Sequence, residues 1–149
     1  MNRAKLFYFL FYGATAALSP FLTLYYQSLG LRGTEIGLLA GLVPLTGLVC
    51  GTLWNAAADA TRRYRAILLT AVGGAWLATL LVSRAGGLAA LLPTVLLMAA
   101  FSAPIATLID SSVITRTRAT GGDYGRVRLW GSIGWGMGAL LAGPVIDRE

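Results

Sequence analysis

The stretch IGLLAGLVPLTGLVCGTLWNAAA (residues 36–58) contains no charged side chain. A helix needs roughly 20 apolar residues to cross a hydrocarbon core about 30 Å thick, so this stretch is long enough to span a membrane. Four more uncharged stretches of at least 18 residues occur along the chain: Leu6–Leu31, Ala66–Ser83, Ala85–Ile109 and Leu129–Ile146. We therefore expect an all-α membrane protein whose residues 1–149 form a single bundle with five spans, near 6–28, 35–58, 65–83, 87–111 and 127–146.

The composition supports a membrane protein and argues against an enzyme. Hydrophobic residues make up 56% of the chain and charged residues 12%, whereas soluble domains carry about 25% charged residues. Cys50 is the single cysteine and histidine is absent, which removes a disulfide framework, the usual metal ligands and the commonest general base. No phosphate-binding loop or catalytic set of Ser, His and Asp is visible, so we expect no metal site, no bound cofactor and no enzymatic activity.

The basic residues predict an orientation. Nine of the twelve Arg and Lys residues fall on one side of the five spans: Arg3, Lys5, Arg62, Arg63, Arg65, Arg116, Arg118, Arg126 and Arg128. Arg32, Arg84 and Arg148 fall on the other side. The positive-inside rule makes the basic side cytoplasmic, with the N-terminus inside a cell (inner) membrane. The net charge of +6 is explained by this signal and by anionic headgroups, so we expect no nucleic-acid partner. The first apolar run exceeds the length of a signal-peptide core, which favours an uncleaved helix.

Several local signals predict how the helices begin and connect. Thr34 is expected to cap the second span, with Glu35 favourable in its first turn, and Asp123 is expected to cap the fifth. The connection between spans four and five is expected to be the longest and most polar. Prolines inside the spans predict kinks, which suit a polar interior cavity; they are Pro20, Pro44, Pro93 and Pro104.

Glycines recur at a spacing of four residues on the second and fifth spans. The pairs are Gly37 with Gly41, Gly47 with Gly51, and Gly134 with Gly138. Small residues at this spacing allow helix backbones to approach closely in lipid. Tight packing is the main interpretation, and helices that slide against each other in a working cycle are the alternative.

Three residues on spans four and five are candidates for binding a solute. Asp110 follows a long uncharged run, and acids inside a membrane are expensive and commonly functional; the alternative is that it marks the end of the span. Arg128 lies at the start of span five, where it either reaches headgroups or points inward. Trp135 follows Arg128 by seven residues and so returns to the same helix face, whereas Arg126 lies about 200° away.

The chain resembles the N-terminal half of a major facilitator superfamily transporter. The similarity is greatest to the branch of lactose permease and the phenylpropionate and nucleoside permeases. Four stretches, covering most of the chain, carry the resemblance: YGATAALSPFLTLYYQSLGLRGTEIGLLAG (12–41), LWNAAADATRRYR (53–65), SAPIATLIDSSV (102–113) and DYGRVRLWGSIGWGMGALLAG (123–143).

The resemblance implies roles for particular residues. It implies that Asp110, Arg128 and Trp135 bind substrate, because lactose permease uses an acid on helix four and an arginine and a tryptophan on helix five in that order. It also implies that Asp59, with Arg62 and Arg63, forms a gating loop. Asn55 and Arg62 stand where the family signature has glycine, and Ala60 stands where a basic residue is usual. Asp110 is also one methylene shorter than the family's glutamate.

For the fold, the resemblance implies five helices that form most of an N-terminal six-helix bundle. Such transporters have two bundles that rock about a central site, so the missing C-terminal half would be the partner of this chain. The implied function is a proton-coupled permease for a small polar or aromatic solute such as a sugar, nucleoside or aromatic acid. A non-transporting membrane partner or fragment, and a drug exporter of the same superfamily, are the alternatives.

Overall fold

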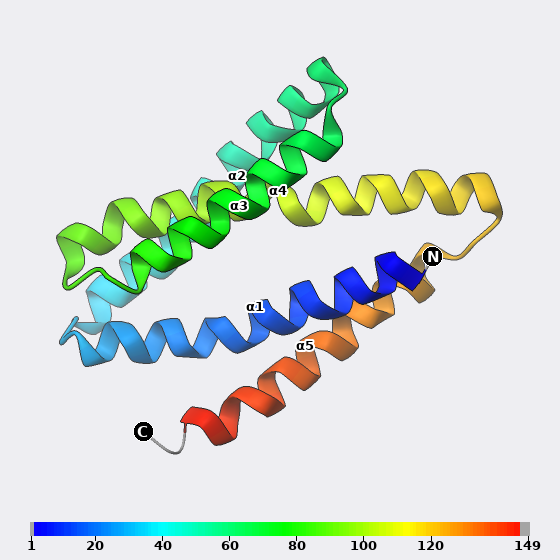
Figure 1. Cartoon of the computed structure of the whole chain (residues 1–149). Helices are drawn as coiled ribbons and strands as arrows, with labels where there is room; N and C mark the ends of the chain where they lie inside the picture. Colours follow the sequence, from blue (N-terminus) through cyan, green and yellow to red (C-terminus); the bar gives the residue numbers. More distant parts are fainter. Residues whose placement is uncertain (1, 147–149) are drawn as a thin grey trace. The chain divides into compact units, whose positions relative to one another are not determined.

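The computed structural model describes residues 2–146 and the side chains of residues 2–142. Five α-helices account for nearly all of this part (Figure 1): α1 Asn2–Ser28, α2 Gly33–Thr61, α3 Tyr64–Val82, α4 Leu88–Thr120 and α5 Tyr124–Ile146. No strand occurs among the described residues. The expected all-α fold is therefore confirmed, with helix bounds close to the predicted spans except at the end of α4. Arg148, which the charge count assigned to the less basic side, lies outside the described residues.

Four of the helices have the length and composition needed to cross a membrane. Within the described residues these are α1, α2, α3 and α4. Their apolar surfaces point outward: Leu48 on α2 is 73% exposed and Trp76 on α3 is 63% exposed. Such surfaces suit contact with lipid rather than water. α5, whose last side chains are not described, remains a spanning helix by prediction.

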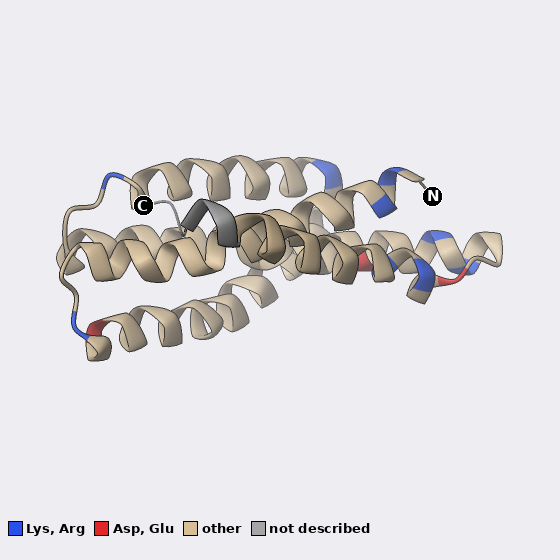
Figure 2. Ribbon diagram, turned by 90° about the horizontal axis from the view of Figure 1, so that it is seen from below, with Lys and Arg blue, Asp and Glu red and all other residues tan. Residues whose placement is uncertain are grey.

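Most charged residues lie at helix ends and in the connections (Figure 2), and Asp110, inside α4, is an exception. This distribution is the one expected when hydrocarbon surrounds the middle of each helix, because an ionised side chain there is costly.

The predicted long loop between spans four and five is wrong. α4 continues to Thr120, and only residues 121–123 connect it to α5. The polar residues of this segment satisfy themselves within the helix: the Ser112 hydroxyl donates to the Leu108 carbonyl at 2.8 Å, and the Thr117 hydroxyl to the Val113 carbonyl at 3.0 Å. The helix stops at Gly121, which has φ +64°, where the Gly122 N–H bonds the Thr117 carbonyl at 2.9 Å. This is a Schellman-type ending.

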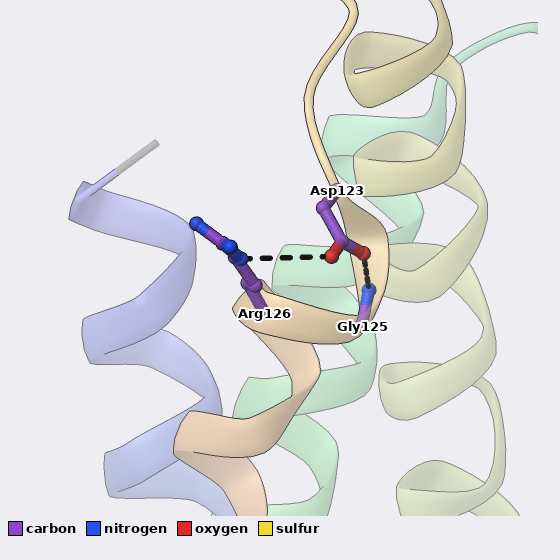
Figure 3. A network of polar contacts seen from close by, with 3 residues as sticks. All are labelled: Asp123, Gly125 and Arg126. Atoms are coloured by element: carbon purple, nitrogen blue, oxygen red, sulfur yellow. Dashed lines mark hydrogen bonds and ion pairs between the residues drawn. The ribbon is translucent and has the colours of Figure 1, made fainter.

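The helix starts agree with one of the two predicted caps. The Asp123 carboxylate accepts the Gly125 N–H at 2.8 Å and lies 3.7 Å from the Arg126 Nε (Figure 3), so it caps α5 as expected. Thr34 does not cap α2, because that helix begins at Gly33 and its cap residue is Arg32. There the Glu35 carboxylate accepts the Arg32 N–H at 2.7 Å.

The chain divides into two compact units, each described by itself. The first contains residues up to Ser28 and those from Val113 onward; the second is Leu29–Ser112. In the first unit α1 packs along α5 (Figure 1). A Cβ added at Gly134 would collide with the Phe9 carbonyl, and one added at Gly138 with the Gly13 carbonyl. The predicted close packing of the Gly134 and Gly138 face is confirmed.

The α1–α5 contacts also give the relative direction of these two helices. Phe9 meets Gly134 and Gly13 meets Gly138, so the residue numbers rise together and the helices are parallel. The first and fifth spans have three spans between them, so they must cross the membrane in the same direction. Parallel packing is therefore what the hypothesis of five spans requires.

In the second unit a glycine and a polar pair join the helices. Gly74 of α3 lies against the Phe101 ring of α4, where any added Cβ would overlap the ring. The Thr107 hydroxyl of α4 donates to the Asn55 side-chain oxygen of α2 at 3.2 Å. Among the α2 glycines, an added Cβ at Gly51 would lie 3.7 Å from the Ala103 side chain. Within the described residues nothing lies within 4 Å of a Cβ at Gly37, Gly41 or Gly47, so the close packing of these three glycines stays a prediction.

Candidate functional site

The candidate solute site is a cavity of about 300 Å³ between α1 and α5. One residue of α1 and four residues of α5 form its wall. The α5 residues are Arg128 and those three, four and seven positions after it. The lining residues are Tyr12, Arg128, Gly131, Ser132 and Trp135. Since residues at this spacing share one face of a helix, the predicted common face of Arg128 and Trp135 is confirmed.

Arg128 is held in place by Tyr12. Its Nη1 donates to the Tyr12 hydroxyl at 2.8 Å, and its guanidinium carbon lies 5.3 Å from the centroid of the same ring. The contact combines a charge-assisted hydrogen bond with a cation–π interaction. It fixes the planar guanidinium of a half-buried arginine at the edge of the cavity.

Glycine in α5 makes the approach of Tyr12 possible. A Cβ at Gly131 would lie 2.8 Å from the Tyr12 ring, much closer than an ordinary contact. Any larger residue would therefore push the ring, and with it the hydrogen-bond partner of Arg128, away from α5. Gly131 is a positioning residue for the cavity.

Arg126 has a different environment from Arg128, although only two residues separate them. Its side chain is 83% exposed and pairs with Asp123 at the start of α5 (Figure 3). The prediction that the two arginines occupy different faces is confirmed. Arg126 contributes little to stability, because exposed ion pairs are worth about 0–1 kcal/mol.

Asp110 lies on α4 within the second unit, where its side chain is half-buried. The residues that line the cavity belong to the first unit, whereas Asp110 belongs to the second. Trp135 is 46% exposed, so its ring presents a free face.

The predicted gating residues lie at the turn between α2 and α3. The Asp59 carboxylate accepts a hydrogen bond from the Tyr64 hydroxyl at 2.8 Å. Within the described residues it forms no ion pair with Arg62 or Arg63. Arg62 ends α2 with φ +54°, the left-handed conformation that glycine adopts most easily.

Two residues of importance were missed by sequence reasoning. Tyr12 was quoted within a longer stretch but not singled out, and Tyr64 was not considered as a partner of Asp59. A polar aromatic residue inside an apolar span was the available signal for Tyr12. Its partner, 116 residues away along the chain, could not be named without the packing of α1 on α5.

Comparison with known proteins identifies the family. The MFS_1 like family matches residues 1–149. Maltose permease of Geobacillus stearothermophilus is 36% identical over 96% of this chain, and the probable 3-phenylpropionic acid transporter of Escherichia coli K12 is 31% identical over 93%. The uncharacterized transporter YwbF of Bacillus subtilis is 26% identical over 97%.

The matched region is about a third of each relative: 36% of maltose permease and of YwbF, and 37% of the phenylpropionic acid transporter. No solved structure matches the chain. The family consists of multi-pass membrane transporters and not of enzymes, as expected from the residues. The chain therefore belongs to the MFS_1 like family of the major facilitator superfamily.

Proposed function

We propose that this chain forms the N-terminal part of a secondary active transporter, and that the cavity of Tyr12, Arg128 and Trp135 holds part of its solute. The observation that carries the proposal is the half-buried Arg128, whose guanidinium is oriented by Tyr12. The exposed ring of Trp135 follows about two helical turns later on the same face of α5. An arginine inside a spanning helix is costly, and such residues commonly mark functional sites.

The chemistry of the cavity favours a small polar or aromatic solute. The guanidinium offers donors to a hydroxyl or carboxylate, and the indole offers a flat face for a sugar or aromatic ring. A volume of about 300 Å³ is at the lower limit of ligand sites, as expected for a partial site. The matched relatives are named for a sugar and for an aromatic acid. Asp110 is proposed as a further solute-binding residue, an acceptor for solute hydroxyls.

Uptake by cells that express the complete reading frame containing this chain tests the proposal. The panel is maltose, 3-phenylpropionate and a nucleoside. For the transported solute, Arg128→Gln and Trp135→Ala are expected to reduce uptake at least tenfold, because single charge-assisted bonds and ring contacts contribute about 1.5 kcal/mol or more.

Arg126→Gln is the matched control, since Arg126 faces away from the cavity, and it should leave uptake within about twofold of the parent. Equal loss in the Arg126 and Arg128 variants would contradict the assignment of the cavity. Asp110→Ala tests the acid separately.

We also propose that Asp59, Arg62 and Arg63 act in gating. The support is the position of Asp59 and its bond to Tyr64, which ties the end of α2 to the start of α3. Asp59→Asn should lower the maximal uptake rate without changing the apparent affinity for the solute. A change in affinity alone would indicate a ligand role instead.

Proton coupling and the cytoplasmic N-terminus complete the proposal. The excess of basic residues at one set of helix ends supports the orientation. A protonophore should abolish concentrative uptake if the coupling ion is a proton. A fluorescent tag at the N-terminus should resist external protease in intact cells of the expected orientation.

A non-transporting helical membrane partner is the second candidate. Open space at Gly37, Gly41 and Gly47 leaves a face of α2 that helices outside this chain could cover. Co-purification distinguishes the candidates. A stoichiometric complex of this five-helix chain with another membrane protein, in cells that show no solute uptake, would favour the partner role.

A further inference from the structure

A second cavity, of about 560 Å³, lies at the turn between α2 and α3 and is not part of the candidate solute site. Its wall combines three guanidinium groups with the apolar first turns of α3. The lining residues are Arg62, Arg63, Tyr64, Arg65, Ala66 and Leu69. This combination of basic and apolar residues in one lining is the starting point of the inference.

The cavity has three arginines and, among the described residues, no ion pair that neutralises them. Within the described residues, no ion pair involves Arg62, Arg63 or Arg65. The nearest acid, Asp59, accepts the Tyr64 hydroxyl instead. The start of α3 adds positive potential, since its first turn contains no acidic residue and its cap residue, Arg63, makes no side-chain cap bond. An external anion would relieve the mutual repulsion of these groups.

The apolar residues of the lining indicate what kind of anion fits. Ala66 and Leu69 follow the arginines along α3, and Leu69 is 62% exposed. A soluble anion would use only the arginines and leave this apolar surface uncovered. A phospholipid satisfies both parts at once, because its phosphate meets the arginines and its acyl chain follows Leu69.

We propose that the turn between α2 and α3 is a binding site for an anionic phospholipid of the membrane leaflet that it faces. Arg62, Arg63 and Arg65 hold the headgroup phosphate, and Ala66 and Leu69 contact the first carbons of an acyl chain. The proposal does not depend on the solute or on transport, since it concerns a different cavity.

Native mass spectrometry of the purified chain in detergent tests the site. The lipids are phosphatidylglycerol and phosphatidylcholine with identical acyl chains, and glycerol 3-phosphate serves as the soluble anion. The triple variant R62Q/R63Q/R65Q should weaken phosphatidylglycerol binding by a factor of about 100, because each basic residue near a membrane surface contributes about fivefold. Binding of phosphatidylcholine should change much less.

A matched triple variant, R32Q/R84Q/R126Q, removes the same charge from other helix ends and should retain binding. The variant R62K/R63K/R65K keeps the charge and should recover most of the affinity, with circular dichroism confirming helical structure in all variants. Leu69→Ser should weaken the lipid but not glycerol 3-phosphate. Equal loss in the two glutamine triples would overturn the proposal in favour of bulk charge. Displacement of the lipid by equimolar glycerol 3-phosphate would overturn it in favour of a soluble anion.

Discussion

The contact between Gly134 of α5 and the backbone of Phe9 on α1 predicts that alanine destabilises the chain at position 134. At Gly136, where no such contact exists, alanine is predicted to stabilise it. A Cβ at Gly134 would overlap the Phe9 carbonyl oxygen and lie 2.8 Å from its carbonyl carbon and Cα. Ordinary contacts begin near 3.4 Å, so Gly134→Ala must separate α1 from α5 by at least about 0.6 Å on this line. A gap of that size forfeits roughly a quarter or more of the dispersion attraction between the facing atoms.

The expected energies follow from these distances. Overpacking of this kind costs about 1–3 kcal/mol, and the better helix propensity of alanine offsets only about 1 kcal/mol of it. Gly136 lies two residues away on the same helix, and nothing lies within 4 Å of a Cβ there. Gly136→Ala should therefore gain about 0.5–1 kcal/mol, since only helix propensity changes.

The assay is unfolding in mixed micelles by increasing sodium dodecyl sulfate, followed by the fluorescence of Trp130 and Trp135 on α5. Gly134→Ala is expected to unfold at lower denaturant than the parent chain and Gly136→Ala at higher denaturant. If the two variants have equal stability, or if Gly134→Ala is the more stable, the packing of α1 on α5 deduced from these glycines is refuted.

Two further perturbations test the polar pair of the second unit and the turn between α2 and α3. Replacing Asn55 by Ala and Thr107 by Val should reveal a coupling energy of about 0.6 kcal/mol in a double-mutant cycle, the average for interhelical hydrogen bonds in membranes; additive effects would show that the bond contributes nothing. Arg62→Gly should raise the free energy of unfolding by up to about 1 kcal/mol in lipid-free detergent by relieving a left-handed conformation, and a lowered unfolding midpoint would contradict this.

Much of this protein was predictable from residue order. An uncharged run as long as 36–58 indicates a membrane-spanning helix, because it matches the thickness of the hydrocarbon core of a membrane. The positions of the five helices followed from these runs to within a few residues, and Asp123 was recognisable as a cap because capping is local. The polar segment after Asp110 was misread as a loop, since its hydroxyls bond carbonyls of the preceding turn and only Gly121 ends the helix.

The candidate site was only half predictable. A period of seven residues placed Arg128 and Trp135 on one face of α5, and this depends on helix geometry alone. Tyr12, which orients Arg128, comes from the other end of the chain, and its proximity depends on the absence of a side chain at Gly131. Periodicity along one helix contains no information about which partner helix covers it.

The sequence by itself determined that this chain consists of membrane helices, that Asp123 caps α5, and which family the chain belongs to. Only the tertiary structure decided that α1 and α5 pack in parallel through Gly134 and Gly138, and that Tyr12 holds Arg128. It also decided that the arginines of the turn between α2 and α3 line one cavity together with Ala66 and Leu69. The physical reason is range: hydropathy and capping depend on residues close together in the sequence, whereas the contact of Tyr12 with Arg128 requires helices from opposite ends of the chain to pack together.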